Sequence, residues 1–562
     1  MKKQIQFYAS IIFMIVVMGG CAGQFPPSGG PRDSIAPTII STFPASNSLN
    51  FNGNYFSISF SEFVKTSSVE NALFISPSLG TLTYNWSGTS VDIYYSLPLK
   101  NKTTYVVIVG TDVVDINNNN HLKETYSFAF STGNVIDSSE IVGRVYDTQP
   151  SRIFIFGYNS RSVNFDTLSP HHVQPDYISQ TSDDGKFTLS HLAYGTYRIF
   201  AIRDVDRNLL FDGESDEIGI AQNDIFLNDS LPKVGDVFFQ MERRDMTAPF
   251  MISIESMHST EVVVTMSEPM NTGSFKNNIT IVDSLTKIPL QIYDAYSDIS
   301  ISKKIFVQTY QQTNTAYHLE CYNVKDTSGN EMRRELSSAF FAGNIAIDTI
   351  TPRIIYSSLT DSMKEVSCTE QFLFTFNTSI AVPKLTEWIF CTDSSGKTIG
   401  LKYEWKSPRT VLVIPEQKLS SAVWYSMALF CGRIESKSGN KFQDSVVNFR
   451  FKTMDENIFG VLKGRIKRNE KLHSARIIIL AKNIEMQKTP LRTAEANSNG
   501  EFVFENLYPG KHVVSAFSDD NGDGKYSYGN ILPFIPAEKF VVHTDTIKIR
   551  SRWSVEGVII KF

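Results

Sequence analysis

The sequence has no concentrated basic segment and, beyond its first twenty residues, no long apolar run. Its 53 Lys and Arg against 58 Asp and Glu give a formal net charge of -5. No run of five or more basic residues occurs, which argues against nucleic acid as a partner. No later segment supplies the roughly 18 consecutive apolar residues that a membrane-spanning helix needs. Contact with a membrane is therefore expected only through the amino-terminal segment.

Cysteine is scarce, with five in 562 residues. Apart from Cys21, the cysteines are Cys321, Cys368, Cys391 and Cys431, and three of these fall within one predicted domain. An even number permits disulfides in an oxidising compartment, but this distribution prevents a simple pairing. We therefore expect buried free thiols. No Cys-x-x-Cys pair or Cys/His cluster predicts a structural zinc site.

Motifs of common catalytic sites are also lacking. No Gly-x-Ser-x-Gly elbow occurs, and Gly396-Lys-Thr398 fails as a phosphate loop because Cys391 stands where the first glycine is required. His121-Leu-Lys-Glu124 has the spacing of zinc carboxypeptidase ligands, but it lies in an Asn-rich segment before a predicted closing strand. His171-His172 is best explained as a loop pair beside Pro170. We therefore predict that the chain is not an enzyme.

The first residues carry the strongest local signal. Lys2-Lys3 precedes the apolar run Ile11–Met18, and Gly19-Gly20-Cys21 follows. A basic start, a short apolar segment and small residues before a cleavage point predict a signal peptide at 1–20. The small residues before Cys21 also resemble a bacterial lipobox, with Met18 in place of the more common leucine. This resemblance implies that Cys21 is lipidated and anchors the chain in a membrane.

Residues 21–32 contain the lipidated cysteine and a Pro- and Gly-rich tether. Ala22 is not the aspartate that bacterial lipoproteins use for inner-membrane retention, so the resemblance implies an outer-membrane location. No acidic cluster of the kind linked to surface export follows the cysteine. The periplasmic face is therefore slightly favoured over the cell surface.

Internal repeats organise the rest of the chain, which is too long for one hydrophobic core. Asp33-Ser-Ile-Ala-Pro37 returns as Asp245-Met-Thr-Ala-Pro249 and as Asp348-Thr-Ile-Thr-Pro352. Each proline pushes the preceding residue toward extended geometry, which suits the start of a first strand. Three modules therefore begin with one signature.

Each signature is followed by alternating apolar residues, a late tyrosine, an Asp/Asn/Gly turn and a closing aromatic strand. Such period-two segments in units of about 100 residues predict antiparallel β-sandwiches. The motifs Phe-x-Phe-Ser-Glu, Asp-x-x-Gly-Asn and Phe-x-Phe-x-Thr resemble the bacterial Ig-like domains of S-layer-type proteins. The resemblance predicts Ig-like modules at 33–134, 245–345 and 348–455.

Glu62 and Glu268 follow the alternating strand at the same place in the first two Ig-like modules. An acid repeated in this way favours a role in the fold, such as a hydrogen bond to a neighbouring turn, over catalysis. The third module departs from the pattern, since Asn377-Thr378 stands where the others have Ser-Glu.

A second repeat fills the remaining segments. Residues 184–201 align without a gap on 499–516, at a constant offset of 315 residues that continues through Asp204 and Asp519. The pattern of a strand, Asp-Gly-x-Phe, Leu-x-x-Gly-x-Tyr and a further strand resembles transthyretin-like, carboxypeptidase-regulatory-like sandwiches. It predicts transthyretin-like modules at 140–240 and 458–562. The turn glycines Gly185, Gly195, Gly500 and Gly510 are expected at positive φ.

Both transthyretin-like modules continue into an acidic loop. Oxygen-bearing side chains at alternate positions are what a hard cation such as Ca²⁺ binds, and the loops resemble the calcium loops of bacterial surface-adhesin B domains. Neither loop has Glu at position 12, where Ser215 and Asn530 stand. Turns capped by side-chain to backbone hydrogen bonds remain the alternative. The candidate ligands are Asp204, Asp206, Asn208 and Asp212 in one loop and Asp519, Asn521 and Asp523 in the other.

The predicted fold class is all-β, an elongated chain of three Ig-like and two transthyretin-like β-sandwiches. The leader, its cysteine and the segment Pro27–Asp33 also resemble an uncharacterised family of Bacteroidetes lipoproteins. We expect a non-enzymatic outer-membrane lipoprotein that acts as a binding, spacer or adhesion-type scaffold in the cell envelope. The alternative is a polysaccharide- or peptidoglycan-binding accessory lipoprotein. The expected partners are the membrane, through the lipid, and an envelope protein or glycan; no cofactor is required beyond possible structural Ca²⁺.

Overall fold

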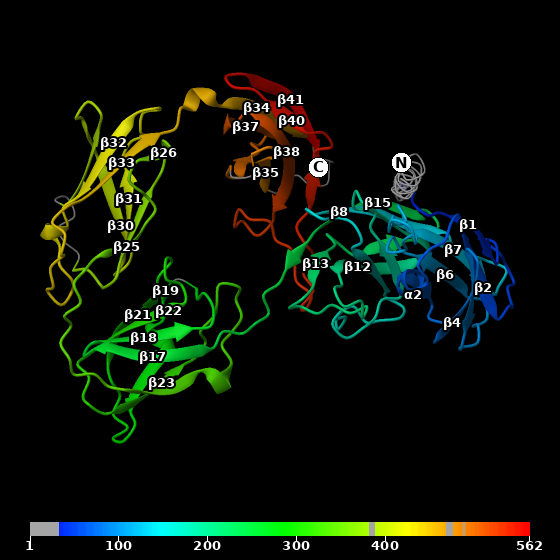
Figure 1. Ribbon diagram of the computed structural model, residues 1–562, viewed down its shortest axis with the longest axis horizontal. Coiled ribbons are helices and arrows are strands. Elements are labelled where there is room, and N and C mark those ends of the chain that lie inside the picture. The colour runs from blue at the N-terminus through cyan, green and yellow to red at the C-terminus, as the bar shows by residue number, and fades with distance from the viewer. Residues whose placement is uncertain (1–32, 272, 382–387, 468–475, 487–488) are drawn as a thin grey trace, which may run out of the picture. The chain divides into compact units, whose positions relative to one another are not determined.

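The computed structural model describes residues 33–271, 273–381, 388–467, 476–486 and 489–562. The predicted signal peptide, Cys21 and the tether lie outside the described residues. Almost every labelled element in Figure 1 is a strand, which confirms the all-β prediction. Within the described part of the chain, no helix has the length and apolar character needed to cross a membrane.

The chain divides into two compact units. Of the described residues, one unit comprises those of 33–168, 174–203 and 223–240, and the other comprises those of 169–173, 204–222 and 241–562. The first unit holds the first Ig-like module and most of the segment 140–240; this segment and 458–562 keep the names of the predicted transthyretin-like modules. The second unit holds the remaining modules together with the first acidic loop.

The first Ig-like module packs two antiparallel sheets face to face. Alternate residues of β2 (Tyr55–Phe60) are buried, including Phe56 and Phe60, because successive side chains of a strand point to opposite faces. They meet Phe128 and Phe130 of the opposite sheet in one core. The sheet orders are β1-β2-β5-β4 and β3-β6-β7. The other elements are β1 (Ile39–Phe43), α2 (Thr66–Ala72), β3 (Leu73–Ser76), β4 (Leu82–Ser87), β5 (Ser90–Tyr95), β6 (Thr104–Val109) and β7 (Tyr126–Ser131).

The first transthyretin-like module brings its opening and closing strands together. Strands β8 (Ser139–Tyr146) and β15 (Lys233–Gln240) pair in parallel, and β11 (Lys186–Leu192) pairs with β8 on its other side. A second sheet has the order β10-β9-β12, with β14 also paired to β12, while β13 pairs with β16. These strands are β9 (Phe154–Asn159), β10 (Tyr177–Gln180), β12 (Gly195–Arg203), β13 (Glu217–Ile220), β14 (Ile225–Leu227) and β16 (Glu242–Arg243).

The second Ig-like module repeats the two-sheet arrangement around its own core. Val262 and Val264 from one sheet pack with Ile281 and Leu319 from the other. The sheet orders are β17-β18-β22-β21-β19 and β20-β23-β24. The strands are β17 (Met251–His258), β18 (Glu261–Met266), β19 (Gly273–Ser274), β20 (Ile279–Asp283), β21 (Ile292–Ser297), β22 (Lys304–Thr309), β23 (Ala316–Cys321) and β24 (Ser338–Ala342).

The third Ig-like module has the same kind of core, with Phe372, Phe374 and Phe376 facing Tyr425 and Phe451. Its sheet orders are β25-β27-β31-β30 and β26-β33-β32-β28-β29. The strands are β25 (Ile354–Ser357), β26 (Met363–Val366), β27 (Phe372–Phe376), β28 (Ile389–Asp393), β29 (Thr398–Ile399), β30 (Leu401–Ser407), β31 (Thr410–Pro415), β32 (Trp424–Leu429) and β33 (Val447–Thr453).

The second transthyretin-like module reproduces the strand order of the first. Opening strand β34 again pairs in parallel with closing strand β41, in the order β37-β34-β41, and the second sheet is β36-β35-β38-β39 with β40 paired to β38. The strands are β34 (Gly460–Lys467), β35 (Arg476–Asn483), β36 (Arg492–Glu495), β37 (Glu501–Leu507), β38 (Gly510–Asp519), β39 (Phe540–Val542), β40 (Ile547–Ile549) and β41 (Ser554–Lys561).

The predicted turn glycines have positive φ. Gly185 lies at 82° and Gly500 at 78°, and Gly195 and Gly510 are also positive. A Cβ atom would lie 2.4 Å from the carbonyl oxygen of Val145 at the first position and 2.7 Å from that of Ile466 at the second. Both conformation and space therefore require glycine at these turns.

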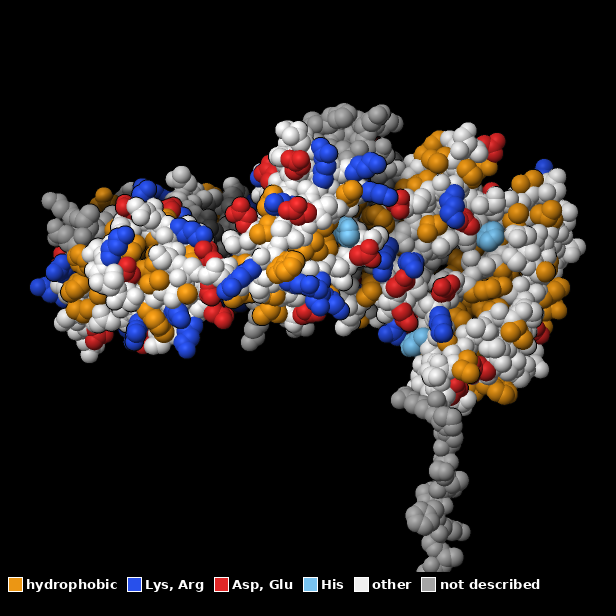
Figure 2. All heavy atoms as spheres, turned by 90° about the horizontal axis from the view of Figure 1, so that it is seen from above, with side chains coloured by type: hydrophobic (Ala, Val, Ile, Leu, Met, Phe, Trp, Pro, Cys, Tyr) orange, Lys and Arg blue, Asp and Glu red, His pale blue; other side chains and the backbone are white. Residues whose placement is uncertain are grey.

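The surface mixes charges of both signs. Figure 2 shows Lys and Arg side chains interspersed with Asp and Glu across the visible face, with apolar side chains scattered between them. This distribution follows the near balance of basic and acidic residues in the sequence.

Candidate cation sites

The acidic loop of the second transthyretin-like module begins where β38 ends, at Asp519. Three backbone amides fold the loop around its own side chains. Gly524 N donates to Asp519 Oδ2 over 3.1 Å, Asp523 N to Asn521 Oδ1 over 2.9 Å, and Lys525 N to Asp523 Oδ1 over 2.7 Å. Gly524 has a φ of 75°. The side-chain oxygens of alternate residues are thus gathered inside one tight turn.

The acidic loop of the first transthyretin-like module has the same hydrogen-bond pattern. Leu209 N donates to Asp204 Oδ2 over 2.9 Å, Asn208 N to Asp206 Oδ1 over 3.3 Å, and Leu210 N to Asn208 Oδ1 over 2.7 Å. Each donor and acceptor lies 315 residues before its counterpart. The gapless sequence repeat therefore extends to the fold of the loop.

A buried carboxylate holds both ends of each loop. Glu538 accepts from Asp520 N over 2.8 Å and from Ser527 N over 2.9 Å. In the first module, Asp216 accepts from Val205 N over 3.1 Å and from Asp212 N over 2.8 Å. Neither carboxylate is among the predicted ligands. Asp216 follows Ser215 at the end of its loop, but the repeat gives no signal for Glu538, because the residue 315 positions after Asp216 is Ile531.

The two loops differ in the hydrogen bonds that the carboxylate of their first aspartate accepts. Asp204 accepts from Arg207 N over 2.7 Å at Oδ1 and from Leu209 N at Oδ2, and burial raises its pKa to about 6. Asp519 Oδ2 accepts from Gly524 N and from Arg476 Nη1, the latter over 3.0 Å. Asp519 Oδ1 is buried and has no hydrogen-bond partner among the described residues.

Asn208 closes the first loop further. Its Nδ2 donates to Asp206 Oδ2 over 3.0 Å and to Asp212 Oδ2 over 2.7 Å. The structure therefore brings these three candidate ligands together, and hydrogen bonds within the loop occupy at least one side-chain oxygen of each of the four, Asp204 included. In the other loop, Asn521 Nδ2 donates to Asp523 Oδ2 over 3.1 Å.

Three carboxylates meet in the first Ig-like module, where the signature, the Ser-Glu pair and the Asp/Asn turn converge. Ligand atoms of Asp33, Glu62 and Asp115 all lie within 4.8 Å of one another. Asp115 is fully buried and accepts from Asn118 N and Asn120 Nδ2. Burial and the charges of Asp33 and Asp115 raise the pKa of Glu62. Such an oxygen-only cluster has the donor chemistry of a hard-cation site.

The second Ig-like module contains the same cluster. Asp245, Glu268 and Asp326 again place ligand atoms within 4.8 Å of one another. Asn330 Nδ2 links the cluster, since it donates to Asp326 Oδ2 over 2.9 Å and to the Asp245 carbonyl oxygen over 3.0 Å. Burial, Asp245 and Asp326 raise the pKa of Glu268.

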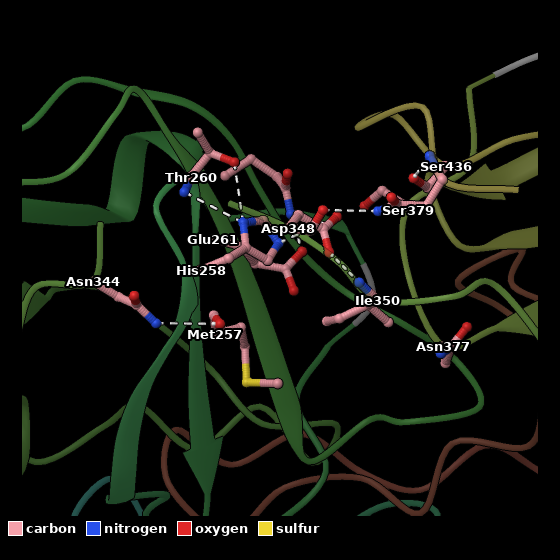
Figure 3. Close-up of polar contacts among 12 residues, drawn as sticks. Met257, His258, Thr260, Glu261, Asn344, Asp348, Ile350, Asn377, Ser379 and Ser436 are labelled. Carbon is pink, nitrogen blue, oxygen red and sulfur yellow. Dashed lines mark hydrogen bonds and ion pairs between the residues drawn. The ribbon is translucent and has the colours of Figure 1, made fainter. Parts of the chain in front are cut away.

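The third Ig-like module keeps the framework of the cluster but not its charges. Asn440 Nδ2 donates to the Asp348 carbonyl oxygen over 2.9 Å, as Asn330 does in the second module. Thr378 stands where the others have Glu, and Ser436 occupies the place of the turn aspartate, where its Oγ accepts from Asn440 N. Figure 3 shows Asp348 near His258 instead, with Asp348 Oδ2 3.7 Å from His258 Nε2.

The sequence patterns singled out Asp33 and Glu62 in one module and Asp245 and Glu268 in another. They did not predict that these acids meet Asp115 and Asp326. The available signal was the joint loss of two acids in the third module, at Thr378 and Ser436. Two positions that lose their charge together in one copy of a repeat are candidates for a common site.

The structure also places the four predicted free cysteines and two of the histidines considered in the sequence. Cys321, Cys368, Cys391 and Cys431 are free and buried, as predicted. His121 Nδ1 lies 3.1 Å from the Thr111 carbonyl oxygen, and its Nε2 lies 3.2 Å from Arg152 Nη1. His171 packs against Phe211 with ring centroids 4.8 Å apart, and burial lowers its pKa.

A buried ion pair joins the second and third Ig-like modules. Arg409 Nη2 contacts both carboxylate oxygens of Glu261, at 2.6 and 2.7 Å, and the two side chains are only 4% and 3% exposed. The Arg409 guanidinium also lies over the Phe306 ring, 4.0 Å from its centroid, and its Nε donates to the Tyr296 hydroxyl. Figure 3 shows Glu261 beside His258 and Thr260 of the second module.

Further hydrogen bonds cross the same junction. Thr410 Oγ1 donates to Asp298 Oδ2 over 2.6 Å, and the Tyr296 hydroxyl lies 3.0 Å from Ser379 Oγ. In the other compact unit, Gln180 lies between the first Ig-like and first transthyretin-like modules, where its Nε2 donates to Asp112 Oδ2 over 2.6 Å. Buried polar contacts of this kind hold neighbouring modules in defined orientations because breaking them leaves unpaired groups away from water.

The outer face of the first Ig-like module carries a row of aromatic side chains on three neighbouring strands. Phe43 and Tyr55 have ring centroids 5.3 Å apart, and Tyr55 stacks on Tyr94 at the same distance. Phe43 and Tyr94 are 46% and 39% exposed. Exposed aromatic rings in a row can stack against flat, partly apolar ligands.

Comparison with known proteins identifies the domain type of two modules. Residues 33–132 and 348–453 match the bacterial Ig-like domain family, which confirms the predicted resemblance for the first and third Ig-like modules. A comparison with curated proteins finds no match.

Solved structures similar to the chain include two of the surface-layer protein SbsC. Its N-terminal part is 16% identical, with 36% of this chain and 44% of that chain covered and a TM-score of 0.16. Domains 1–6 of SbsC are 8% identical, with 92% and 67% covered and a TM-score of 0.16. BcpA, the major pilin subunit of Bacillus cereus, is 8% identical, with 52% and 94% covered and a TM-score of 0.14. The chain thus spans less than half of the first of these structures.

Proposed function

We propose that this chain is a non-enzymatic lipoprotein scaffold of the bacterial outer membrane, in which β-sandwich modules hold a binding surface at a distance from the lipid anchor. The lipobox-like sequence before Cys21 supports the anchor. The periplasmic face is slightly favoured, since no acidic cluster follows Cys21. An envelope protein is the proposed partner.

The observation that carries the spacer role is the buried junction at Arg409 and Glu261. A chain that only needed to string domains together would be served by solvated, flexible linkers. Here an ion pair, in which one arginine nitrogen contacts both carboxylate oxygens, and an arginine–aromatic contact are buried between two modules. A buried pair of this kind favours one packing of the two modules, because a packing that kept one charge buried and moved the other away would leave a charge unpaired. A spacer benefits from that stiffness.

The anchor is tested by Cys21→Ala in the native host. Lipidated wild-type protein should label with radioactive palmitate and fractionate with outer membranes, whereas the variant should be unlabelled and soluble in the periplasm or medium. Palmitate labelling of the variant, or its unchanged membrane association, would contradict the anchor. Crosslinking in whole cells followed by mass spectrometry should then recover one reproducible envelope protein with the wild type.

A second candidate function is the binding of polysaccharide or peptidoglycan, which the aromatic row Phe43, Tyr55 and Tyr94 favours. Tyr55→Ala with Tyr94→Ala should abolish retention on purified cell wall if sugar rings stack there. Tyr310→Ala is the matched control, since Tyr310 is an exposed aromatic of another module. Equal retention of all three proteins would exclude this row as a glycan platform.

A further inference from the structure

We propose that the Asp519 loop is a binding site for a hard divalent cation of the Ca²⁺ type. Asp519 is the first residue of this loop. Its side chain is 0% exposed, and its Oδ2 receives the amide of Gly524 from the far side of the loop. The carboxylate therefore lies inside the turn, where Oδ1 has no hydrogen-bond partner among the described residues.

A buried carboxylate oxygen without a donor is costly, and a bound cation is one of the few groups that satisfies it. Arg476 meets part of the charge, since its Nη1 lies 3.0 Å from Asp519 Oδ2, but it also pairs with Glu495 and leaves Oδ1 untouched. The unsatisfied lone pairs thus point to a ligand at Oδ1.

The remaining oxygens of the loop are suited to the same ion. Asn521 and Asp523 follow Asp519 at alternate positions, and the Lys525 carbonyl lies at position 7 of the loop. Carboxylate, amide and carbonyl oxygens at these positions match the preference of Ca²⁺ for six to eight oxygen ligands in flexible geometry. No nitrogen or sulfur ligand belongs to the set, which disfavours zinc and copper.

Glu538 holds the loop in shape through hydrogen bonds that do not require a bound ion. It is buried and binds the amides of Asp520 and Ser527, which are the second and ninth residues of the loop. The loop is therefore held in its bound shape by the module, so that little ordering remains to oppose binding.

The Asp204 loop provides an internal comparison. The same fold is present there, and in both loops an asparagine amide donates to a neighbouring carboxylate, Asn208 to Asp206 and Asn521 to Asp523. The difference is that both oxygens of Asp204 accept backbone amides. That loop is closed by its own hydrogen bonds. Of the two first aspartates, only Asp519 has a buried carboxylate oxygen without a hydrogen-bond partner among the described residues.

The test is calcium titration of the full-length chain by calorimetry, together with terbium luminescence sensitised by Tyr526, which lies in the loop. Asp523→Asn keeps the shape of an exposed ligand and should weaken calcium binding at one site by about 10- to 100-fold, with loss of the terbium signal. Asp206→Asn, at an exposed position of the self-closed loop, should leave both readings unchanged.

The double variant Glu62→Gln/Glu268→Gln provides a second background for the titration. It removes one acid from each three-carboxylate cluster, so that calcium bound at the clusters can be told from calcium bound at the loop. Retention of the Asp523-dependent site in this background supports the assignment. The proposal is overturned if the wild type binds no calcium at millimolar concentration, if Asp523→Asn binds with unchanged stoichiometry and affinity, or if the terbium signal survives in it. Circular dichroism that matches the wild type establishes that each variant is folded.

Discussion

Arg409 of the third Ig-like module and Glu261 of the second form an ion pair almost completely removed from solvent, in which Arg409 Nη2 lies 2.6 and 2.7 Å from the two carboxylate oxygens. Burial alone would lower the pKa of Arg409, but Glu261 reverses this and raises it. Each charged group therefore stabilises the charged form of the other in the interior.

This dependence predicts asymmetric effects of mutation. Arg409→Met should destabilise the junction by about 3–5 kcal/mol, since it strands a buried carboxylate. The double variant Arg409→Met/Glu261→Met should recover much of that loss because no charge is left unpaired. Denaturant unfolding measures both free energies, and limited proteolysis between residues 343 and 352 reports separation of the modules.

Lys406→Met is the matched control for the junction. Lys406 pairs with Glu404 on an exposed part of β30, with side chains 43% and 54% exposed, so its loss should cost less than about 1 kcal/mol. A single Arg409 variant that is no less stable than this control would show that the buried pair does not hold the modules together.

The three-carboxylate cluster of the second Ig-like module predicts a stabilising mutation. Burial and the charges of Asp245 and Asp326 raise the pKa of Glu268 in the folded state. A raised carboxyl pKa contributes stability below the unfolded value, and this contribution is lost as the pH rises through the folded value. At neutral pH with chelator, Glu268→Gln should therefore raise the melting temperature by about 2–4 °C.

Glu255→Gln makes the same charge change at an exposed position of β17 and should shift the melting temperature little. If both variants behaved alike under chelator, repulsion within the cluster would be too weak to matter. The third Ig-like module has already lost two of these charges, at Thr378 and Ser436.

The first acidic loop predicts a pH-dependent stability. Burial raises the pKa of Asp204 to about 6 from an ordinary value of 3.8. The folded state then holds a proton that the unfolded state has released, so the free energy of unfolding should fall between about pH 4 and 6, by up to about 3 kcal/mol. Chemical denaturation across this range measures the slope, and Asp204→Asn should flatten it. An identical slope in the variant would assign the effect to other groups.

The four buried thiols predict a simple labelling pattern. Burial raises the pKa of Cys321 and Cys391 to about 12 and that of Cys431 to about 11, and it also raises that of Cys368. Since the thiolate is the reactive form, maleimide at neutral pH should leave all four unmodified in the folded protein. Mass spectrometry should find all four modified after guanidinium unfolding. Modification of any of them in the folded protein would show local opening.

The repeats made much of this architecture predictable. Alternating segments such as Phe56 to Phe60 are buried at every second residue, because a strand has only two faces. The constant offset between Asp204 and Asp519 correctly implied that their loops fold alike. Local patterns of this kind depend on few residues that lie close together in the chain.

Contacts between distant residues were not predictable in the same way. Glu538 reaches the Asp519 loop from 18 residues beyond Asp520, and the equivalent carboxylate in the other module is Asp216. The Arg409–Glu261 pair joins residues 148 positions apart. Neither relationship leaves a local pattern, since both are created by packing between strands and modules.

The parallel pairing of β8 with β15 has a consequence for how the chain is made. Lys233 of the last strand contacts Glu140 of the first, 93 residues earlier. Contacts so far apart in sequence form late and slowly. While the polypeptide is being synthesised, the opening strand must wait, with its edge unpaired, until nearly the whole module has emerged. A nascent chain with two such modules is therefore exposed to aggregation through these unpaired edges for longer than the size of each module suggests.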